Sequence, residues 1–290
     1  MKNDDPIQPY TTGSVVSKDG TTISYRQLGQ GPGLIIVHGG MQAAQNFMKL
    51  ANALASQYTL YMPDRRGRGA SGVPGVDYGI EKECEDIEAL LVKTGARFIF
   101  GLSSGAIISL NATLKYPAIR KAAIYEPPFP IDPTTPDYRF IKRYNKEIAQ
   151  NKPGAAFISV ITGLKMSFLL GLVPRFIMEP LANMLMKRNE EQLQPGEIPL
   201  NALVPCFKYD HILVDETKGE LDKFRQVKAD ILLLSGSRSP HFLKQVINRL
   251  KAMVPHSRHV EFKGLDHMGS DNSGKPKVVA EELHQFFGNG

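Results

Sequence analysis

The stretch FIFGLSSGAIISL, residues 98–110, constrains the fold of this chain more than any other feature. An apolar run is interrupted by two glycines and two serines and then continues with the apolar spacing of a helix. A buried strand, a sharp Gly-x-Ser-x-Gly turn and a following helix are the parts of a nucleophile elbow. Gly101 and Gly105 leave the space that a tight turn needs, and the helix start directs unpaired N–H groups towards the turn. The stretch therefore predicts an exposed, nucleophilic Ser103.

A plainer interpretation of the same stretch is a glycine turn in which a serine caps a helix. A lone Gly-x-Ser-x-Gly occurs often by chance, but here the flanking strand and helix are those that the elbow requires. We therefore interpret Ser103 as the nucleophile. For Ser104 we expect a helix cap, whose backbone N–H matters more than its hydroxyl.

Short β-type runs alternate with helical patterns along most of the chain. This alternation predicts an α/β fold, a mainly parallel sheet with helices on both faces, and residues 13–28 fit an antiparallel hairpin at its edge. The helix expected over residues 79–93 carries many acidic residues, which we place on its outer face. We expect further strands within residues 33–40, 58–64, 97–103, 121–128, 230–240 and 259–267, and further helices over 43–57, 241–253 and 276–287.

The alternation stops after Glu126 for about ninety residues of proline-punctuated helical sequence. We therefore expect a single domain over residues 1–290 with an inserted helical cap at about 127–215. The apolar faces of residues 155–190, which are rich in Met, Phe and Leu, are predicted to line the entrance to Ser103. Ordinary core packing of these faces is the alternative interpretation.

Two prolines divide the most apolar part of this insertion. Pro174 and Pro180 predict separate short helices, because proline interrupts a helix interior. The stretch 166–186 approaches the length of a membrane span, but the two prolines, together with Arg175 and Glu179, lie near its middle. These residues argue against a spanning helix.

Charge and cysteine content narrow the class of protein further. The chain has 35 Lys and Arg against 29 Asp and Glu, a net charge of +6, but the charges are interspersed and no nucleic-acid-binding motif accompanies them. We therefore expect no nucleic-acid partner. Cys84 and Cys206 are the only cysteines, which predicts no disulfide framework and a reducing compartment. Residues 1–13 are polar without an apolar export segment, so we expect a cytoplasmic protein.

Three further motifs accompany the elbow: HGG at residues 38–40, PDRRGRGASG at 63–72 and GLDHMG at 264–269. With these motifs the chain resembles the α/β-hydrolase family over nearly its whole length apart from the inserted lobe. The resemblance implies an eight-stranded sheet and places the catalytic histidine at His267. Histidine has an unperturbed pKa of about 6.5, so it can take a proton from a serine and return it to a leaving group.

The same resemblance implies an oxyanion hole. The N–H of Gly40, or alternatively of Met41, would join that of Ser104 in holding developing negative charge. We interpret His38 as a structural side chain that orients this loop. The three arginines of residues 63–72 fit a salt-bridged loop beside Asp64, with an anion-binding patch as the alternative.

The chain departs from the family pattern at the triad acid. Most members carry an aspartate after the seventh strand, but the corresponding loop SGSRSPHF contains no Asp or Glu. Glu126 follows the strand after the elbow helix, a place that some lipases and thioesterases of this fold use, and we predict that it orients His267. Asp210 is the second candidate and Asp266 the third, and a structural brace is the alternative role for Glu126.

These residues predict a cofactor-independent serine hydrolase that cleaves a carboxylic ester, lactone or related acyl compound. The expected partner is a small apolar or mixed substrate bound near Met41, Leu102 and Met268, and a homodimer is possible. We expect no metal site, and the remaining histidines, His211 among them, are placed at exposed positions without a role. A carbon–carbon bond hydrolase or lyase, or a non-catalytic small-molecule receptor, remains an alternative on the same scaffold.

Overall fold

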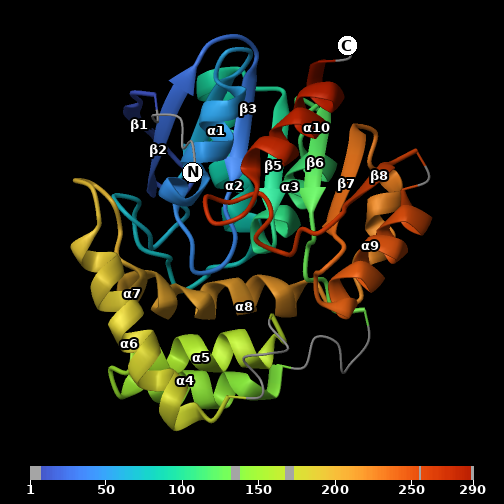
Figure 1. The fold of residues 1–290 in the computed structure, drawn as a ribbon. Helices are drawn as coiled ribbons and strands as arrows, with labels where there is room; N and C mark the ends of the chain where they lie inside the picture. Colours follow the sequence, from blue (N-terminus) through green and yellow to red (C-terminus); the bar gives the residue numbers. More distant parts are fainter. Residues whose placement is uncertain (1–7, 132–137, 167–172, 255, 289–290) are drawn as a thin grey trace.

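A computed structural model of the chain describes residues 8–131, 138–166, 173–254 and 256–288. These residues form one eight-stranded sheet in the order β1-β2-β4-β3-β5-β6-β7-β8 (Figure 1). All of the expected strands are present, so the predicted fold class is confirmed. Their bounds are β1 Thr11–Val16, β2 Thr22–Gly29, β3 Gly33–Val37, β4 Thr59–Pro63, β5 Phe98–Leu102, β6 Lys121–Tyr125, β7 Asp230–Gly236 and β8 Arg258–Phe262.

The expected hairpin forms one edge of the sheet. β1 and β2 pair antiparallel with Val16 opposite Thr22, and Gly20 takes the positive φ of 85° that the turn between them requires. β2 is also antiparallel to β4, whereas all pairs among β3 to β8 are parallel. The carboxyl ends of the parallel strands therefore share one edge of the sheet, where α/β proteins gather their reacting groups.

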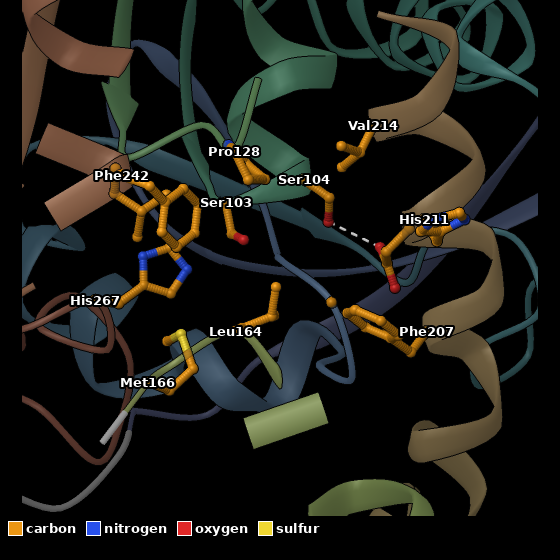
Figure 2. A pocket seen from close by; sticks show the side chains of 13 residues that line it. Ser103, Ser104, Pro128, Leu164, Met166, Phe207, His211, Val214, Phe242 and His267 are labelled. Atoms are coloured by element: carbon orange, nitrogen blue, oxygen red, sulfur yellow. Dashed lines mark hydrogen bonds between the residues drawn. The ribbon is translucent and has the colours of Figure 1, made fainter. Parts of the chain in front are cut away.

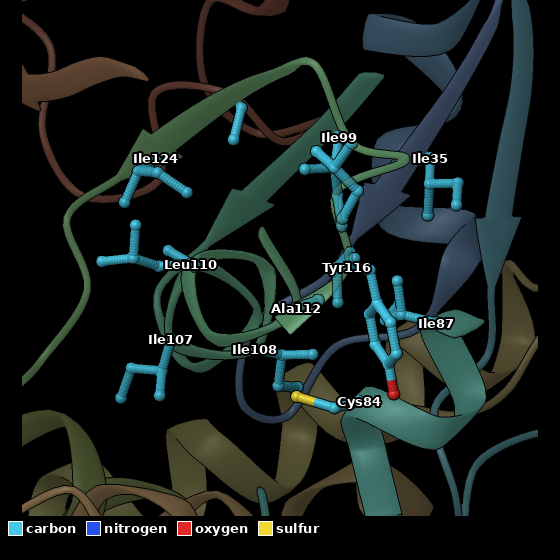
Figure 3. Packing of buried hydrophobic residues seen from close by; sticks show 14 of the residues in the cluster. Ile35, Cys84, Ile87, Ile99, Ile107, Ile108, Leu110, Ala112, Tyr116 and Ile124 are labelled. Atoms are coloured by element: carbon cyan, nitrogen blue, oxygen red, sulfur yellow. The ribbon is translucent and has the colours of Figure 1, made fainter. Parts of the chain in front are cut away.

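Helices cover both faces because successive side chains of a buried strand point to opposite sides. Ile35, Ile99 and Ile124 pack under α2 (Ile80–Thr94), α3 (Ser104–Lys115) and α9 (His241–Met253) in one apolar cluster (Figure 3). Their strand neighbours Leu34 and Phe100 belong to a second cluster, under α1 (Met48–Leu54) and α10 (Pro276–Gly288). α9 has the bounds predicted from the sequence, and α1 is shorter than predicted because Ala44–Phe47 form a 3-10 turn before it.

Three of the five acids of α2 lie elsewhere than predicted. Glu83, Glu85 and Asp86 are buried, 2 to 5% exposed, rather than on an outer face. Glu83 forms an ion pair with Arg65, and Asp86 forms one with Arg66. Both arginines belong to the loop after β4. The prediction was wrong because helical periodicity does not reveal which charged side chains have buried partners from a distant loop.

A helical insertion separates β6 from β7. It contains α4 (Ile141–Ala149), α5 (Pro153–Gly163), α6 (Arg175–Glu191), α7 (Leu200–Leu203) and α8 (Phe207–Glu216), with 3-10 turns at Tyr138–Phe140, Val204–Cys206 and Leu221–Gln226. Figure 1 shows α8 running across the carboxyl ends of the strands, with α4, α5 and α6 beyond it. α5 packs against both α4 and α6. The insertion therefore lies on the side of the sheet where Ser103 is expected.

One of the two expected helix breaks is present. α6 begins directly after Pro174, but Pro180 lies inside the helix, so the prediction of a break there was wrong. The residues after Pro180 are mostly good helix formers, and Ala182 and Met186 are buried, which offsets the one backbone bond that proline removes. Residues 167–172, part of the predicted apolar stretch, lie outside the described residues. None of the helices in the described part of the chain combines the length and apolar character needed to cross a bilayer.

Candidate active site

Ser103 occupies a sharp turn between β5 and α3. Its φ of 58° and ψ of −124° lie in a region that non-glycine residues rarely adopt. Its N–H donates to the carbonyl of Tyr125 at 2.9 Å, and its own carbonyl accepts from the N–H of Ala106 at 2.9 Å. A Cβ at Gly101 would lie 2.3 Å from the carbonyl oxygen of Gly105. The glycines of the motif are thus required by close backbone contacts, and the turn has the elbow conformation.

His267 and Glu126 form a hydrogen-bonded pair beside this turn. The imidazole Nδ1 lies 2.7 Å from Glu126 Oε2, and the N–H of Gly236 donates to Glu126 Oε1 at 2.7 Å. Glu126 follows β6, has a φ of 46° and is completely buried, while His267 follows β8 and is 7% exposed. A carboxylate that accepts the Nδ1 proton leaves Nε2 available as a base. The arrangement can therefore supply an oriented imidazole at the cavity that Ser103 also lines.

The loop after β7 contributes to this pair without an acid of its own. Gly236 provides the backbone N–H that binds Glu126, and a Cβ at Gly236 would lie 2.5 Å from the carbonyl of Leu265. Asp266, the third candidate acid, is exposed and accepts from the N–H of Met268 at 2.9 Å. Among the candidate acids, only Glu126 thus contacts His267 in the described structure.

Asp210, the second candidate acid, has different partners. Its Oδ1 accepts from Arg65 Nη1 at 2.7 Å and from the hydroxyl of Ser104 at 2.8 Å, and its Oδ2 accepts from Arg68 Nη2 at 2.8 Å. Burial works to raise the pKa of Asp210, but the charges of Arg68 and Arg65 outweigh it and hold the pKa below its usual range. Asp210 is therefore an ionised member of a buried network on α8.

Ser104 differs from its prediction. It is the first residue of α3, and Ser103 occupies the cap position without a side-chain bond to the helix backbone. The Ser104 hydroxyl instead donates to Asp210 and accepts from Arg65 Nη1 at 3.0 Å. The prediction that Ser104 caps the helix was wrong. Its hydroxyl binds Asp210, which lies 106 residues away in the chain, so no local pattern indicates this contact. As the first helical residue, Ser104 has a backbone N–H without an intrahelical acceptor.

The loop after β3 borders the cavity and is held by side-chain hydrogen bonds. The N–H of Gly39 donates to Gln42 Oε1 at 2.9 Å, and Gln42 Nε2 donates to Asp271 Oδ2 at 2.8 Å. Met41 has a φ of 54°, and Gly40 lines the cavity together with Ser103 and Ser104. The loop conformation thus brings Gly40 to the same cavity as the first residue of α3.

His38 braces this loop in its neutral form. Its Nδ1 lies 2.9 Å from the carbonyl oxygen of Gly39, and Nε2 accepts from the N–H of Arg65 at 3.1 Å. Nε2 therefore carries no proton, and Nδ1 is the donor. Burial, followed by the charges of Arg68 and Arg65, lowers the pKa of His38 well below its usual value.

The arginines of the motif at residues 63–72 are ion-paired and buried. Arg65 contacts Glu83 at 2.9 Å, and Arg66 contacts Asp86 at 2.7 Å; Arg65, Arg66 and Arg68 are each at most 2% exposed. The loop is thus salt-bridged as expected, but through distant acids rather than Asp64, which accepts from the N–H of Ala44 at 2.8 Å. Guanidinium groups buried in this way do not form an anion-binding patch on the surface.

The cavity beside Ser103 is small, about 30 Å³, and has mostly apolar walls (Figure 2). Of the expected substrate-binding residues, Met41, Leu102 and Met268 are not among the described residues that line it, and Leu102 is 1% exposed within the core. The lining residues are Gly40, Ser103, Ser104, Pro128, Leu164, Met166, Phe207, Asp210, His211, Val214, Phe242, Leu243 and His267.

His211 lies on the cavity wall, not at the exposed position expected for it. It is half-buried on α8, one residue after Asp210, and burial lowers the pKa of its imidazole. The wall residues of α8 and α9 carried no motif, because their approach to Ser103 depends on how the insertion packs. Within the described residues, no group of three or more His, Cys, Asp or Glu side chains is arranged to hold a metal ion.

Comparisons with known proteins agree with this fold. The model of the alpha/beta hydrolase family matches residues 34–282. The uncharacterized hydrolase YraK of Bacillus subtilis is 37% identical over 34% of this chain and 38% of its own length. The 2-(acetamidomethylene)succinate hydrolase of Mesorhizobium japonicum is 23% identical over 92% of this chain and 91% of its own. A crystal structure of an alpha/beta hydrolase from Sphaerobacter thermophilus covers 95% of this chain and 100% of that one, with 27% identity and a TM-score of 0.74.

The family match extends from β3 to α10, so it includes the elbow, the insertion and the His267 loop. The resemblance inferred from the sequence motifs is confirmed at the level of family and fold. The chain therefore belongs to the alpha/beta hydrolase family.

Proposed function

We propose that this protein is a cofactor-independent serine hydrolase of carboxylic esters, lactones or related acyl compounds. The observation that carries the proposal is the 2.7 Å contact between His267 Nδ1 and the buried carboxylate of Glu126, on the same cavity as Ser103. An imidazole held by a carboxylate, beside a serine in a strained elbow, is the arrangement that activates a serine hydroxyl in unrelated folds.

In the proposed reaction, His267 Nε2 takes the hydroxyl proton as Ser103 Oγ attacks the substrate carbonyl carbon. The N–H groups of Gly40 and Ser104 hold the negative charge that develops on the carbonyl oxygen. The imidazolium, stabilised by Glu126, then returns its proton to the leaving group and an acyl-enzyme remains. Water, deprotonated by the same histidine, hydrolyses the acyl-enzyme and restores the serine.

The walls of the cavity indicate the substrate class. Leu164, Met166 and Phe207 from the insertion and Phe242 from α9 are apolar, so we propose an apolar or mixed acyl substrate. We also propose that the insertion acts as a cap, because Leu164, Met166 and Phe207 belong to it. The hydrolase names of the relatives are consistent with hydrolytic chemistry, and their substrates are not assigned to this chain.

A fluorophosphonate probe and short p-nitrophenyl esters test the proposal together. We expect labelling and turnover by the wild type and loss of both in Ser103→Ala. A folded protein without labelling or turnover would contradict the proposal. In that case, a ligand that raises the melting temperature equally in wild type and Ser103→Ala would indicate a receptor, and dependence on His267 with a carbon–carbon substrate would indicate the alternative chemistry.

A further inference from the structure

α6 carries apolar side chains on two neighbouring faces. Met178, Ala182 and Met186 recur at helical spacing, are buried and pack the helix onto the insertion. The neighbouring face is exposed, although it also carries large apolar side chains at helical spacing. Its members, which we call the α6 outer face, are Ile177, Leu181, Met184 and Leu185.

The α6 outer face is a concentration of apolar surface rather than a scatter of single residues. Its four side chains are between 44 and 63% exposed, and they make up four of the eleven large apolar residues that are exposed in the described chain. Exposed apolar residues are ordinary one at a time, but a contiguous patch indicates a surface that contacts something. At 1.5 Å per residue, the nine residues from Ile177 to Leu185 extend this patch over about 13 Å.

Exposed cations of α4 lie beside the start of this face. Lys142, Arg143 and Lys146 are all exposed on α4, whereas its acid, Glu147, is buried. Glu147 accepts from Arg143 at 3.0 Å and from Arg175 of α6 at 2.6 Å, so it ties the two helices together near the start of the α6 outer face. Figure 1 shows α4 and α6 beyond α8, on the side of the insertion away from the sheet.

The balance of charge differs between the two ends of the α6 outer face. Near its far end, Lys187 and Arg188 are followed by Glu190 and Glu191, and all four are exposed. The excess of positive charge therefore belongs to the α4 end. Apolar side chains with cations at one border suit an interface between hydrocarbon and anionic headgroups.

A second copy of the chain fits this surface less well. One helical stripe about 13 Å long and about 10 Å wide offers far less than the ~800 Å² per partner of a standard interface. A symmetric pair would also bring the cations of the two α4 helices towards each other, which opposes association. A bilayer needs no matching shape, and a shallow apolar stripe can enter the headgroup region.

We propose that the α6 outer face, with the cations of α4 beside it, docks this protein onto bilayer surfaces that contain anionic lipid. The apolar side chains enter the boundary between headgroups and acyl chains, while Lys142, Arg143 and Lys146 contact the anionic headgroups. The docking is independent of the proposed reaction, because no residue of the surface lines the cavity beside Ser103.

Co-sedimentation with vesicles of phosphatidylcholine, with and without phosphatidylglycerol, tests the proposal on the full chain. We expect the wild type to sediment with the mixed vesicles and less with pure phosphatidylcholine, and added salt to weaken the binding. Leu181→Ser/Leu185→Ser should lower the partition coefficient at least about tenfold, since two large apolar side chains are lost. Lys142→Gln/Lys146→Gln should weaken binding to the mixed vesicles only.

Val76→Ser/Val92→Ser is the matched control, because both valines are exposed and lie outside α6. It should bind vesicles as the wild type does. A wild type that stays in the supernatant with both vesicle types would overturn the proposal, as would equal losses in the control and the α6 variant. Concentration-dependent self-association in light scattering, abolished by Leu181→Ser/Leu185→Ser, would overturn it in favour of a contact between copies.

Discussion

Three residues of the site have backbone conformations that non-glycine residues rarely adopt. Met41, Ser103 and Glu126 have φ values of 54°, 58° and 46°. The other two non-glycine residues with positive φ in the described chain, Asn151 and Lys165, follow the ends of α4 and α5. Such conformations persist only where the surroundings hold them, and they gather at functional sites. The strain at Met41, Ser103 and Glu126 therefore coincides with the residues of the proposed chemistry.

Glu126→Gln should lower kcat by about 10²- to 10⁴-fold, the upper figure being the cost of a neutralised triad acid in serine proteases. The amide oxygen can still accept from Gly236, so the fold should remain, but a neutral group does not stabilise the imidazolium. Turnover of one p-nitrophenyl ester by folded variants measures this. Asp266→Asn, an exposed acid adjacent to His267, is the control and should keep wild-type kcat. Equal losses in the two variants would contradict the assignment of Glu126.

Ser104→Ala should lower the free energy of unfolding by about 1.5–3 kcal/mol, because it removes a buried hydrogen bond to a charged partner, Asp210. Urea unfolding measures the change. Ser109→Ala is a matched control in the same helix, since its hydroxyl is completely buried and has no hydrogen-bond partner in the described structure. A Ser109→Ala loss as large as that of Ser104→Ala would show that the Asp210 contact contributes nothing particular.

The buried His38 should make stability depend on pH. Its folded pKa lies below the unfolded value of about 6.5, so the unfolded chain binds a proton first as the pH falls. Stability from this group is therefore complete above about pH 6.5 and falls by about 1.4 kcal/mol per pH unit below it. Urea unfolding at several pH values should show a steeper loss for the wild type than for His38→Asn. Parallel pH profiles would contradict a neutral, buried His38.

For helices and strands, the local sequence pattern was sufficient for prediction where the element buries a regular apolar face. The strands, α9 and the elbow followed from periodicity and glycine placement, because those signals lie within a few neighbouring residues. The burial of Glu83 and Asp86 in α2 did not, since their partners are arginines about twenty residues earlier in the chain. Arg65 and Asp210 are 145 residues apart, so no local pattern could pair them.

The proline inside α6, Pro180, leads to a prediction about the stability of that helix. Proline inside α6 removes one backbone hydrogen bond and crowds the preceding turn, so Pro180→Ala should raise the free energy of unfolding by up to about 3 kcal/mol. The greater entropy of the unfolded chain offsets part of this gain. Thermal unfolding measures the net change in stability. Pro174→Ala, which lies before the helix, is the control, and its free energy of unfolding should not rise. A fall in the melting temperature of Pro180→Ala would show that α6 requires the proline geometry.

The whole molecule assembles its site from residues that are distant in the chain but share one edge of the sheet. Ser103, Glu126 and His267 follow β5, β6 and β8, and parallel pairing places those strand ends together. Motif and topology were therefore enough to predict that these three residues belong together. The cavity wall could not be predicted, because Phe207 and His211 of α8 reach it only through the packing of the insertion across the sheet.

The most direct test of the account is the intact mass of the protein after reaction with a fluorophosphonate, followed by peptide mapping. We expect a single adduct on Ser103, no adduct in Ser103→Ala, and slower labelling of Glu126→Gln, since His267 activates the hydroxyl less well without its carboxylate. A folded wild type that gains no adduct, or one that carries it on another serine while Ser103 stays unmodified, would contradict the proposed nucleophile.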